Sequence, residues 1–150
     1  MPEKIKKRLG ELLVEMKLIT SAQLDESLSE QRKAGGLLGE ILVRLGYAKE
    51  EDITKALITQ FGFAYLPLAN YDINTEATKL VTENVARQYC LMPVDKIENA
   101  LTIAMANPLN VKAIEDIEDL TKCSVRVFVS LASDIKRCID KYYNDTPTGR

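Results

Sequence analysis

Histidine is absent from all 150 residues of the sequence. Its absence excludes Ser-His and Cys-His catalytic pairs, histidine metal ligands and imidazole acid–base chemistry. The sequence also lacks G-x-x-x-x-G-K-[ST] and G-x-G-x-x-G, the phosphate-binding signatures of NTPases and dinucleotide folds. Its carboxylates follow helical surface patterns, as in Glu115, Asp116, Glu118 and Asp119, which favours a solvated face over a catalytic pair. We therefore expect no enzymatic activity from this chain.

Long apolar runs and an excess of basic charge are also missing. No stretch of 18 apolar residues and no signal-peptide core occurs, so we expect a soluble, cytoplasmic, unexported chain. The formal charge of −2 argues against a nucleic acid polymer as partner. The three cysteines, Cys90, Cys123 and Cys138, are odd in number and lack C-x-x-C spacing. This pattern favours free, buried thiols in a reducing compartment over a disulfide or a metal site.

The sequence does contain a 24-residue segment that occurs twice, as residues 8–31 and 37–60. At an offset of 29 the identical pairs are Leu9/Leu38, Gly10/Gly39, Glu11/Glu40, Leu13/Leu42, Val14/Val43, Leu28/Leu57 and Gln31/Gln60. A repeat of this length indicates two copies of one supersecondary unit packed together. A ligand that is itself two-fold symmetric would suit such a pair.

Each copy has the pattern of two short helices joined by a turn. Leu9, Leu12 and Leu13 extend a helical stripe that begins at Ile5, and the chain turns near residues 17–19. Thr20-x-x-Gln23 is the signature of a capping box, which predicts the start of the next helix. The second copy predicts helices over 38–45 and 50–60, with a left-handed glycine at position 46 between them.

The pattern changes after the Phe61-Gly62-Phe63 segment, where Tyr65-Leu66-Pro67-Leu68 predicts an extended linker. Beyond it we expect helices over 75–80 and 83–89, strands over 91–97, 100–106 and 124–129, a helix with Asn107 as N-cap and Pro108 first, and a last helix over 133–143. The predicted fold class is α+β. An all-α module of two repeated helical hairpins, residues 1–63, precedes a small α/β module, residues 64–144, and a tail or linker, residues 145–150.

Both copies resemble the paired motif of the MshEN domain, R-L-G-x-x-L-V-x-x-G-x-I-x-x-x-x-L-x-x-x-L-x-x-Q. This domain is the N-terminal domain of many type II secretion and type IV pilus assembly ATPases. Residues 86–94 (ARQYCLMPV), residues 101–109 (LTIAMANPL) and the closing segment 134–143 are similar to the same family. The resemblance therefore covers nearly the whole chain.

The resemblance implies a binding site for cyclic di-GMP, with one motif copy contributing each half. The ligand-binding candidates it gives are Arg8, Leu9, Gly10, Leu13, Leu24, Leu28 and Gln31 from the first copy, and Leu38, Gly39, Leu42, Ile53, Leu57 and Gln60 from the second. Cyclic di-GMP would be a regulatory ligand, and no other cofactor is expected.

These residue types suit a ligand with two purine faces, two guanine edges and two phosphates. Leucines can lie against the purines, glycines let a ligand approach the backbone, and an arginine can bind phosphate or the guanine O6/N7 edge. Each residue also has a structural explanation. The leucines could form a helical core, Gly10 and Gly39 could permit close helix packing, Gln31 and Gln60 could be ordinary helix-end residues, and Arg8 could belong to a solvated basic face. The functional interpretation therefore depends on the whole set.

Three positions depart from the family pattern. Lys17 stands where the first motif usually has a glycine, so its turn lacks the usual left-handed residue. Leu37 stands where the second motif would have a basic residue, which leaves the two half-sites unequal. Asn107 occupies a position that is often aspartate, so a guanine partner there would be a neutral amide.

The expected function is that of a cyclic di-GMP-binding regulatory domain of a secretion or pilus assembly ATPase. Its expected partners are the motor ATPase domain, in the same or a partner chain, and an inner-membrane platform protein, which would make it peripheral to the inner membrane. The alternative is a module of the same family that docks on the platform protein without binding nucleotide. Arg8, the two glycines and the two glutamines favour the nucleotide, whereas Lys17 and Leu37 favour docking.

Overall fold

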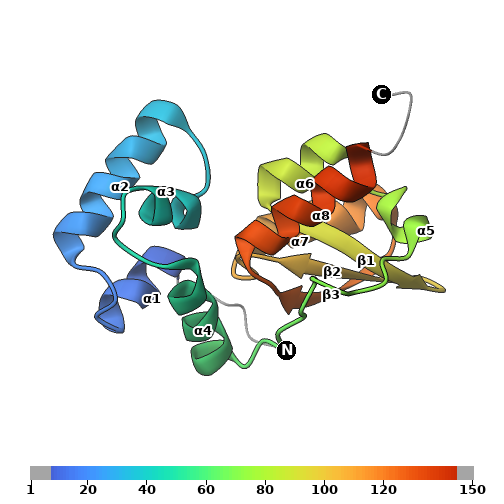
Figure 1. Ribbon diagram of the computed structural model, residues 1–150, viewed down its shortest axis with the longest axis horizontal. Coiled ribbons are helices and arrows are strands. Elements are labelled where there is room, and N and C mark those ends of the chain that lie inside the picture. Colours follow the sequence, from blue (N-terminus) through green and yellow to red (C-terminus); the bar gives the residue numbers. More distant parts are fainter. Residues whose placement is uncertain (1–7, 145–150) are drawn as a thin grey trace. The chain divides into compact units, whose positions relative to one another are not determined.

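The computed structural model describes residues 8–144 of the protein. The chain divides into two compact units, one up to Gly62 and the other from Phe63 onward (Figure 1). The first unit is entirely helical, and the second combines helices with a three-stranded sheet. This is the α+β architecture that the sequence predicts.

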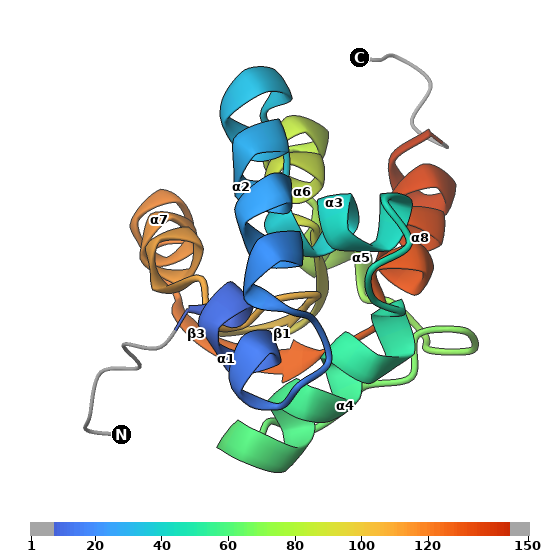
Figure 2. The same ribbon diagram turned by 90° about the vertical axis from the view of Figure 1, so that its left-hand side faces the viewer.

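Unit 1 consists of four helices, α1 (Leu9–Glu15), α2 (Ser21–Ala34), α3 (Leu38–Arg44) and α4 (Glu50–Phe61). Figure 2 shows them as two hairpins, α1–α2 and α3–α4. The core of the unit is aliphatic and comes mostly from the two short helices and α4. Its buried members include Leu9, Leu12, Leu13, Ile19, Ile41, Leu42, Ile53, Ala56 and Leu57.

The two hairpins have the same internal construction. At the offset of 29, α1 and α3 begin and end at equivalent residues, and α2 and α4 begin at equivalent residues. The turn hydrogen bonds also repeat: the Leu18 amide donates to the Leu13 carbonyl at 2.9 Å, and Tyr47 donates to Leu42 at 2.9 Å. The prediction of two related helical hairpins is confirmed, although α4 is two residues shorter than α2. Ile5 lies outside the described residues.

Local sequence signals explain the helix ends in the first hairpin. Thr20 Oγ1 accepts from the Gln23 amide at 3.1 Å, and Gln23 Oε1 accepts from the Thr20 amide at 2.9 Å, which confirms the capping box. The turn before it retains its left-handed residue despite the missing glycine, because Lys17 itself adopts φ 63°. The equivalent Gly46 has φ 81°. The turn geometry is therefore common to both copies, but in the first it requires a strained lysine backbone.

Unit 2 is built on strands β1 (Leu91–Ile97), β2 (Ala100–Met105) and β3 (Ser124–Val129), in the order β1-β2-β3. The first two form an antiparallel hairpin, and β3 pairs with β2 in parallel. The parallel pairing requires a crossover, which helix α7 (Val111–Thr121) supplies. Helix α5 (Thr75–Thr78) contacts β1, while α6 (Glu83–Tyr89) and α8 (Ala132–Asn144) pack against each other and on β1.

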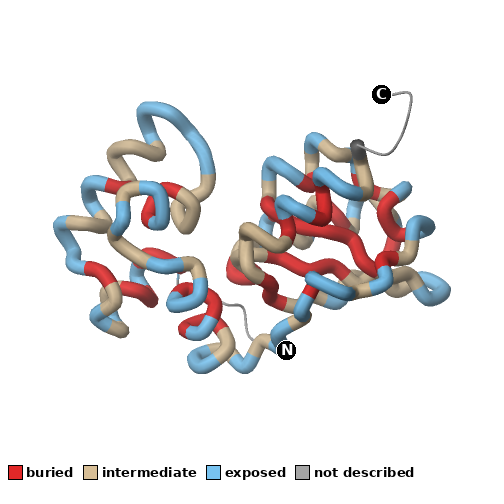
Figure 3. The backbone as a smooth tube through the Cα atoms, viewed as in Figure 1, coloured by how far each residue is buried: buried red, intermediate tan, exposed pale blue. Residues whose placement is uncertain are grey.

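The core of unit 2 lies between the sheet and these helices. Figure 3 shows the buried segments concentrated in the strands. The largest side chains with almost no exposed surface are Leu91, Met92, Leu101, Ile103, Met105, Ile117, Ile135 and Ile139. Cys90, Cys123 and Cys138 are all buried, as the sequence predicts. Burial also raises the pKa of the Cys138 thiol, which disfavours the reactive thiolate.

The predicted N-cap at Asn107 is wrong. Helix α7 begins at Val111, and its N-cap is Asn110, whose side-chain oxygen accepts from the Ala113 amide at 3.2 Å. Asn107 instead accepts from the Leu109 amide at 3.1 Å. This Asx turn competes locally with helix formation, so residues 107–109 form a turn before the helix.

The segment predicted as a linker is extended but is anchored in unit 2. Tyr65 forms an isolated parallel bridge with Val129, and the Leu66 amide donates to the Val129 carbonyl at 2.9 Å. The Ser130 hydroxyl then donates to the Leu66 carbonyl at 2.6 Å, and the Leu68 side chain is buried. These backbone contacts continue the edge of the sheet beside β3.

Candidate functional site

The two motif glycines lie where the hairpins of unit 1 meet. A Cβ atom at Gly10 would lie 2.6 Å from Leu24 Cδ1 in its own hairpin and 3.1 Å from Leu38 Cδ2 in the other. A Cβ atom at Gly39 would lie 3.6 Å from Leu9 Cδ2 and 4.0 Å from Ile53 Cδ1. Leu24 is equivalent to Ile53 and Leu9 to Leu38, so the two glycines make reciprocal contacts. The structure therefore brings together both copies of the motif, as a pseudo-two-fold arrangement requires.

The apolar candidates fall into two groups by burial. The first group is buried and forms the core, and it comprises Leu9, Leu13, Leu42, Ile53 and Leu57. The second group is half-buried and comprises Leu24, Leu28 and Leu38. Only the second group has exposed surface that a ligand could contact. The buried residues of the first group instead hold the hairpins together.

The polar candidates also differ between the copies. Arg8 is exposed, and its backbone amide donates to Glu11 Oε1 at 3.3 Å at the start of α1. Gln31 is half-buried, and its side-chain nitrogen donates to the Gly36 carbonyl at 3.0 Å, so it holds the loop between the hairpins. The equivalent Gln60 is exposed near the end of α4. The equivalent of Arg8 is Leu37, which precedes α3 and is half-buried. The first copy therefore carries more of the polar chemistry.

Five residues outside the candidate set from the sequence connect α2 to the second hairpin or lie close to that connection. The Tyr47 hydroxyl donates to Glu26, and this hydrogen bond raises the pKa of the Tyr47 phenol. Arg44 pairs with Glu30 at 3.9 Å. Ser27 lies on α2 between these two links and is completely buried. The only signal for Ser27 in the repeat is that the equivalent residue, Ala56, is also small.

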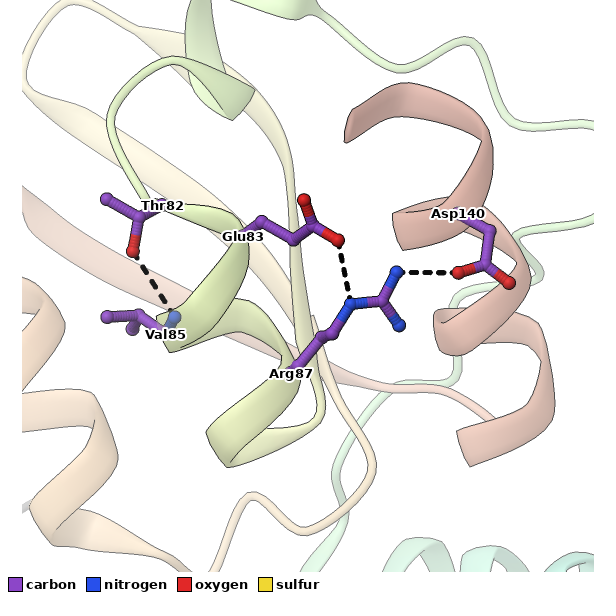
Figure 4. A network of polar contacts seen from close by, with 5 residues as sticks. All are labelled: Thr82, Glu83, Val85, Arg87 and Asp140. Atoms are coloured by element: carbon purple, nitrogen blue, oxygen red, sulfur yellow. Dashed lines mark hydrogen bonds and ion pairs between the residues drawn. The ribbon is translucent and has the colours of Figure 1, made fainter. Parts of the chain in front are cut away.

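Unit 2 carries a separate polar network between α6 and α8, shown in Figure 4. Arg87 donates from Nε to Glu83 at 2.9 Å and from a terminal nitrogen to Asp140 at 2.6 Å. The Asp140 contact and then the Glu83 contact raise the pKa of Arg87. Thr82 caps the same helix by accepting from the Val85 amide at 3.2 Å. The network joins two helices and has the partners expected of a structural ion pair.

The part of the chain that the structure describes has neither a metal-ligand cluster nor a membrane-spanning helix. Residues 8–144 contain no group of three His, Cys, Asp or Glu side chains placed to hold a metal ion. Within the same range, no helix combines the length and the apolar character that crossing a bilayer requires. Asn107 is the position where the family resemblance would place a guanine contact. It belongs to unit 2, and its side-chain oxygen accepts a hydrogen bond in the turn before α7.

Comparison with known proteins extends these observations. The family model of the MshEN domain matches residues 61–149. The chain is 35% identical over 136 residues to the type IV pilus assembly ATPase PilB of Myxococcus xanthus, covering 91% of this chain and 24% of that protein. It is 30% identical over 139 residues to PilB of Thermus thermophilus, covering 91% of this chain and 16% of that protein. The chain thus spans about a quarter or less of the length of these relatives. Because 91% of the chain is covered, the matched region includes at least part of each 24-residue repeat copy.

Two solved structures share the fold. A structure of MshE with cdg has a TM-score of 0.67 and 27% sequence identity, and the match covers 92% of this chain and 100% of that one. The N-terminal domain of XpsE has a TM-score of 0.74 at 22% identity, covering 95% of this chain and 99% of that one. The XpsE likeness supports the fold alone.

Proposed function

This chain belongs to the MshEN domain family, and from that premise we propose that it is a cyclic di-GMP-binding regulatory domain of a pilus or secretion assembly ATPase. The observation that carries the proposal is the reciprocal packing of two equivalent motif copies around Gly10 and Gly39. A ligand with two guanosine halves matches a site with two related halves. The similarity to MshE, whose structure contains cyclic di-GMP (cdg), gives the ligand class.

The described side chains suggest how the ligand would be held. The half-buried Leu24, Leu28 and Leu38 would lie against purine faces. Exposed Arg8 would supply a charge-assisted contact to a phosphate or a guanine edge, and the amide of Gln60 would supply both a donor and an acceptor. The second half-site would depend more on apolar contact, because Leu37 replaces a cation there.

The proposed mechanism is allosteric. The ligand would hold the two hairpins in one arrangement, and the second unit would relay that arrangement to the motor ATPase domain. Such control requires that cyclic di-GMP bind one arrangement more tightly than another. An affinity ratio of about 10 between the two states corresponds to about 1.4 kcal/mol of coupling.

A docking function is the second candidate, and the absence of a cation at Leu37 favours it. Val43 on α3 is also 40% exposed, which adds apolar surface to the second hairpin. In this case the domain would bind the cytoplasmic part of an inner-membrane platform protein and no nucleotide.

Calorimetric titration with cyclic di-GMP separates the two functions. A partly desolvated arginine contact contributes about 1.5–3 kcal/mol, so Arg8→Ala should weaken binding about 10- to 150-fold. Arg8→Lys should restore part of the affinity, since lysine lacks the planar fork. Leu37→Arg should strengthen binding. Lys55→Ala, which removes an exposed cation of α4 at a variable position of the motif, is the matched control and should bind normally.

Two results would contradict the proposal in different ways. No heat signal from the unmodified domain at high micromolar ligand would leave docking as its function. Normal binding by Arg8→Ala would show that the nucleotide binds elsewhere on the chain.

A further inference from the structure

Helix α2 buries fewer of its residues than its repeat equivalent α4 does. Of its 14 residues only Ser27 is fully buried. Helix α4 has 12 residues and buries four of them, Ile53, Thr54, Ala56 and Leu57. Segments with few buried apolar contacts open more readily than the rest of a fold. Of the two long helices in unit 1, α2 is therefore the one expected to move.

The single buried residue of α2 lacks the hydrogen bond it needs. Ser27 has no exposed surface, and within residues 8–144 its hydroxyl is the buried side-chain polar group that has no hydrogen-bond partner. The equivalent position in α4 is Ala56, which needs no partner. An unpaired buried hydroxyl destabilises the arrangement that buries it, and such a group calls for an explanation.

The polar contacts that link α2 to the second hairpin are weak. Arg44 and Glu30 pair at 3.9 Å with side chains 59% and 36% exposed, and exposed ion pairs of this kind contribute little. The hydrogen bond from Tyr47 to Glu26 is also at the surface. The turn leading into α2 contains the left-handed Lys17. These features all belong to the first hairpin or its link to the second.

Ser27 lies on the motif face of α2. It is three residues after Leu24, which packs at Gly10, and four residues before Gln31. Residues at this spacing share one face of a helix. A small displacement of α2 from α3 would therefore expose the hydroxyl beside the half-buried residues of the proposed site.

We propose that α2 moves away from α3 when cyclic di-GMP binds and that the Ser27 hydroxyl then hydrogen-bonds to the ligand. Ser27 is thus a further binding residue, specific to the first motif copy. The phosphate oxygens and the guanine O6 and N7 atoms are the acceptors such a hydroxyl can reach. This inference rests on the proposed function, because it assigns the hydrogen bond to the same nucleotide.

The test combines stability with affinity in one variant. Ser27→Ala removes the unpaired hydroxyl, so the free domain should unfold at a higher temperature. The same change should weaken cyclic di-GMP binding about 2- to 12-fold, the loss expected for one hydrogen bond. Ala56→Ser is the matched control: it adds a buried hydroxyl to α4 and should lower stability while leaving affinity unchanged. If Ser27→Ala raises stability without weakening binding, the serine is only structural and the inference is overturned.

Hydrogen exchange tests the movement independently of the ligand contact. In the free domain, α2 amides should exchange faster than α4 amides, and the ligand should change exchange chiefly in α2. Equal protection of the two helices would overturn the movement. An unmodified domain that shows no cyclic di-GMP binding would refute the proposed function and the role of Ser27 together, whereas normal binding with an inert Ser27→Ala would refute the inference alone.

Discussion

Alanine at the two motif glycines should change stability in opposite directions. At Gly10 the new methyl group would lie 2.6 Å and 3.3 Å from the two terminal carbons of Leu24, and 3.1 Å from Leu38 Cδ2. These side chains must shift to accept it. At Gly39 the closest atom is Leu9 Cδ2 at 3.6 Å, an ordinary van der Waals contact. The same substitution thus meets a crowded position in one copy and an open position in the other.

The magnitudes follow from two opposing effects. Replacing a helical glycine by alanine stabilises by about 0.5–1 kcal/mol, because glycine loses more backbone freedom on folding. Inserting a methyl group into a tightly packed site costs about 1–3 kcal/mol. Gly10→Ala should therefore destabilise by up to about 2.5 kcal/mol. Gly39→Ala should stabilise by about 0.5–1 kcal/mol, since little repacking opposes the gain.

Urea denaturation followed by circular dichroism measures both variants under identical conditions. The expected difference between them is about 1–3 kcal/mol, with similar slopes against denaturant. The reasoning is refuted if Gly10→Ala is as stable as Gly39→Ala. In that case close helix packing does not explain the glycine at position 10. The alternative is that Gly10 lets the ligand approach the backbone. A stable Gly10→Ala variant that no longer binds cyclic di-GMP would show this.

Lys17→Gly should stabilise unit 1 by about 0.5–1 kcal/mol, because it relieves a left-handed lysine, while Gly46→Ala at the equivalent turn should destabilise by a similar amount. Thermal unfolding of both variants checks this, and a destabilised Lys17→Gly would contradict it. Stability should also fall as the pH rises from 10 to 12. Burial raises the pKa of Tyr143 to about 12, so the unfolded chain releases this proton at lower pH than the folded chain does. The Tyr143 hydroxyl donates to the Val81 carbonyl at 2.7 Å, so Tyr143→Phe should be less stable at neutral pH. The variant should also lose less stability between pH 10 and 12. An unchanged pH profile of stability would show that Tyr143 does not cause this loss.

The sequence alone determined the local construction of unit 1. The repeat at an offset of 29 predicted two hairpins, and the capping box at Thr20 and Gln23 fixed where α2 begins. These features are local, since they depend on residues within one or two helical turns. For the same reason the periodicity predicted the strands over 91–97 and 124–129 in unit 2.

Local signals failed where two nearby interactions competed. Asn107 before Pro108 matched the pattern of an N-cap, yet Asn110 caps α7 because Asn107 is used in an Asx turn. Lys17 was expected to alter its turn, yet the surrounding hairpin imposes the left-handed conformation on it. The Asn107 side chain could satisfy either structure, whereas Lys17 only had to tolerate a left-handed backbone, and in both cases the packed fold selects the conformation.

Only the tertiary structure decided which motif residues are core and which are accessible. The sequence gives Leu13 and Leu28 the same apolar character, but Leu13 has no exposed surface and Leu28 is half-buried. It gives no sign that Ser27 is buried without a partner, or that Gly10 is crowded while Gly39 is open. Burial depends on side chains that come together from both hairpins, such as Leu9 at Gly39, and these residues are many helical turns apart in sequence. Periodicity defines the face a residue occupies on its own helix, whereas the depth of that residue depends on what the other helices place against it.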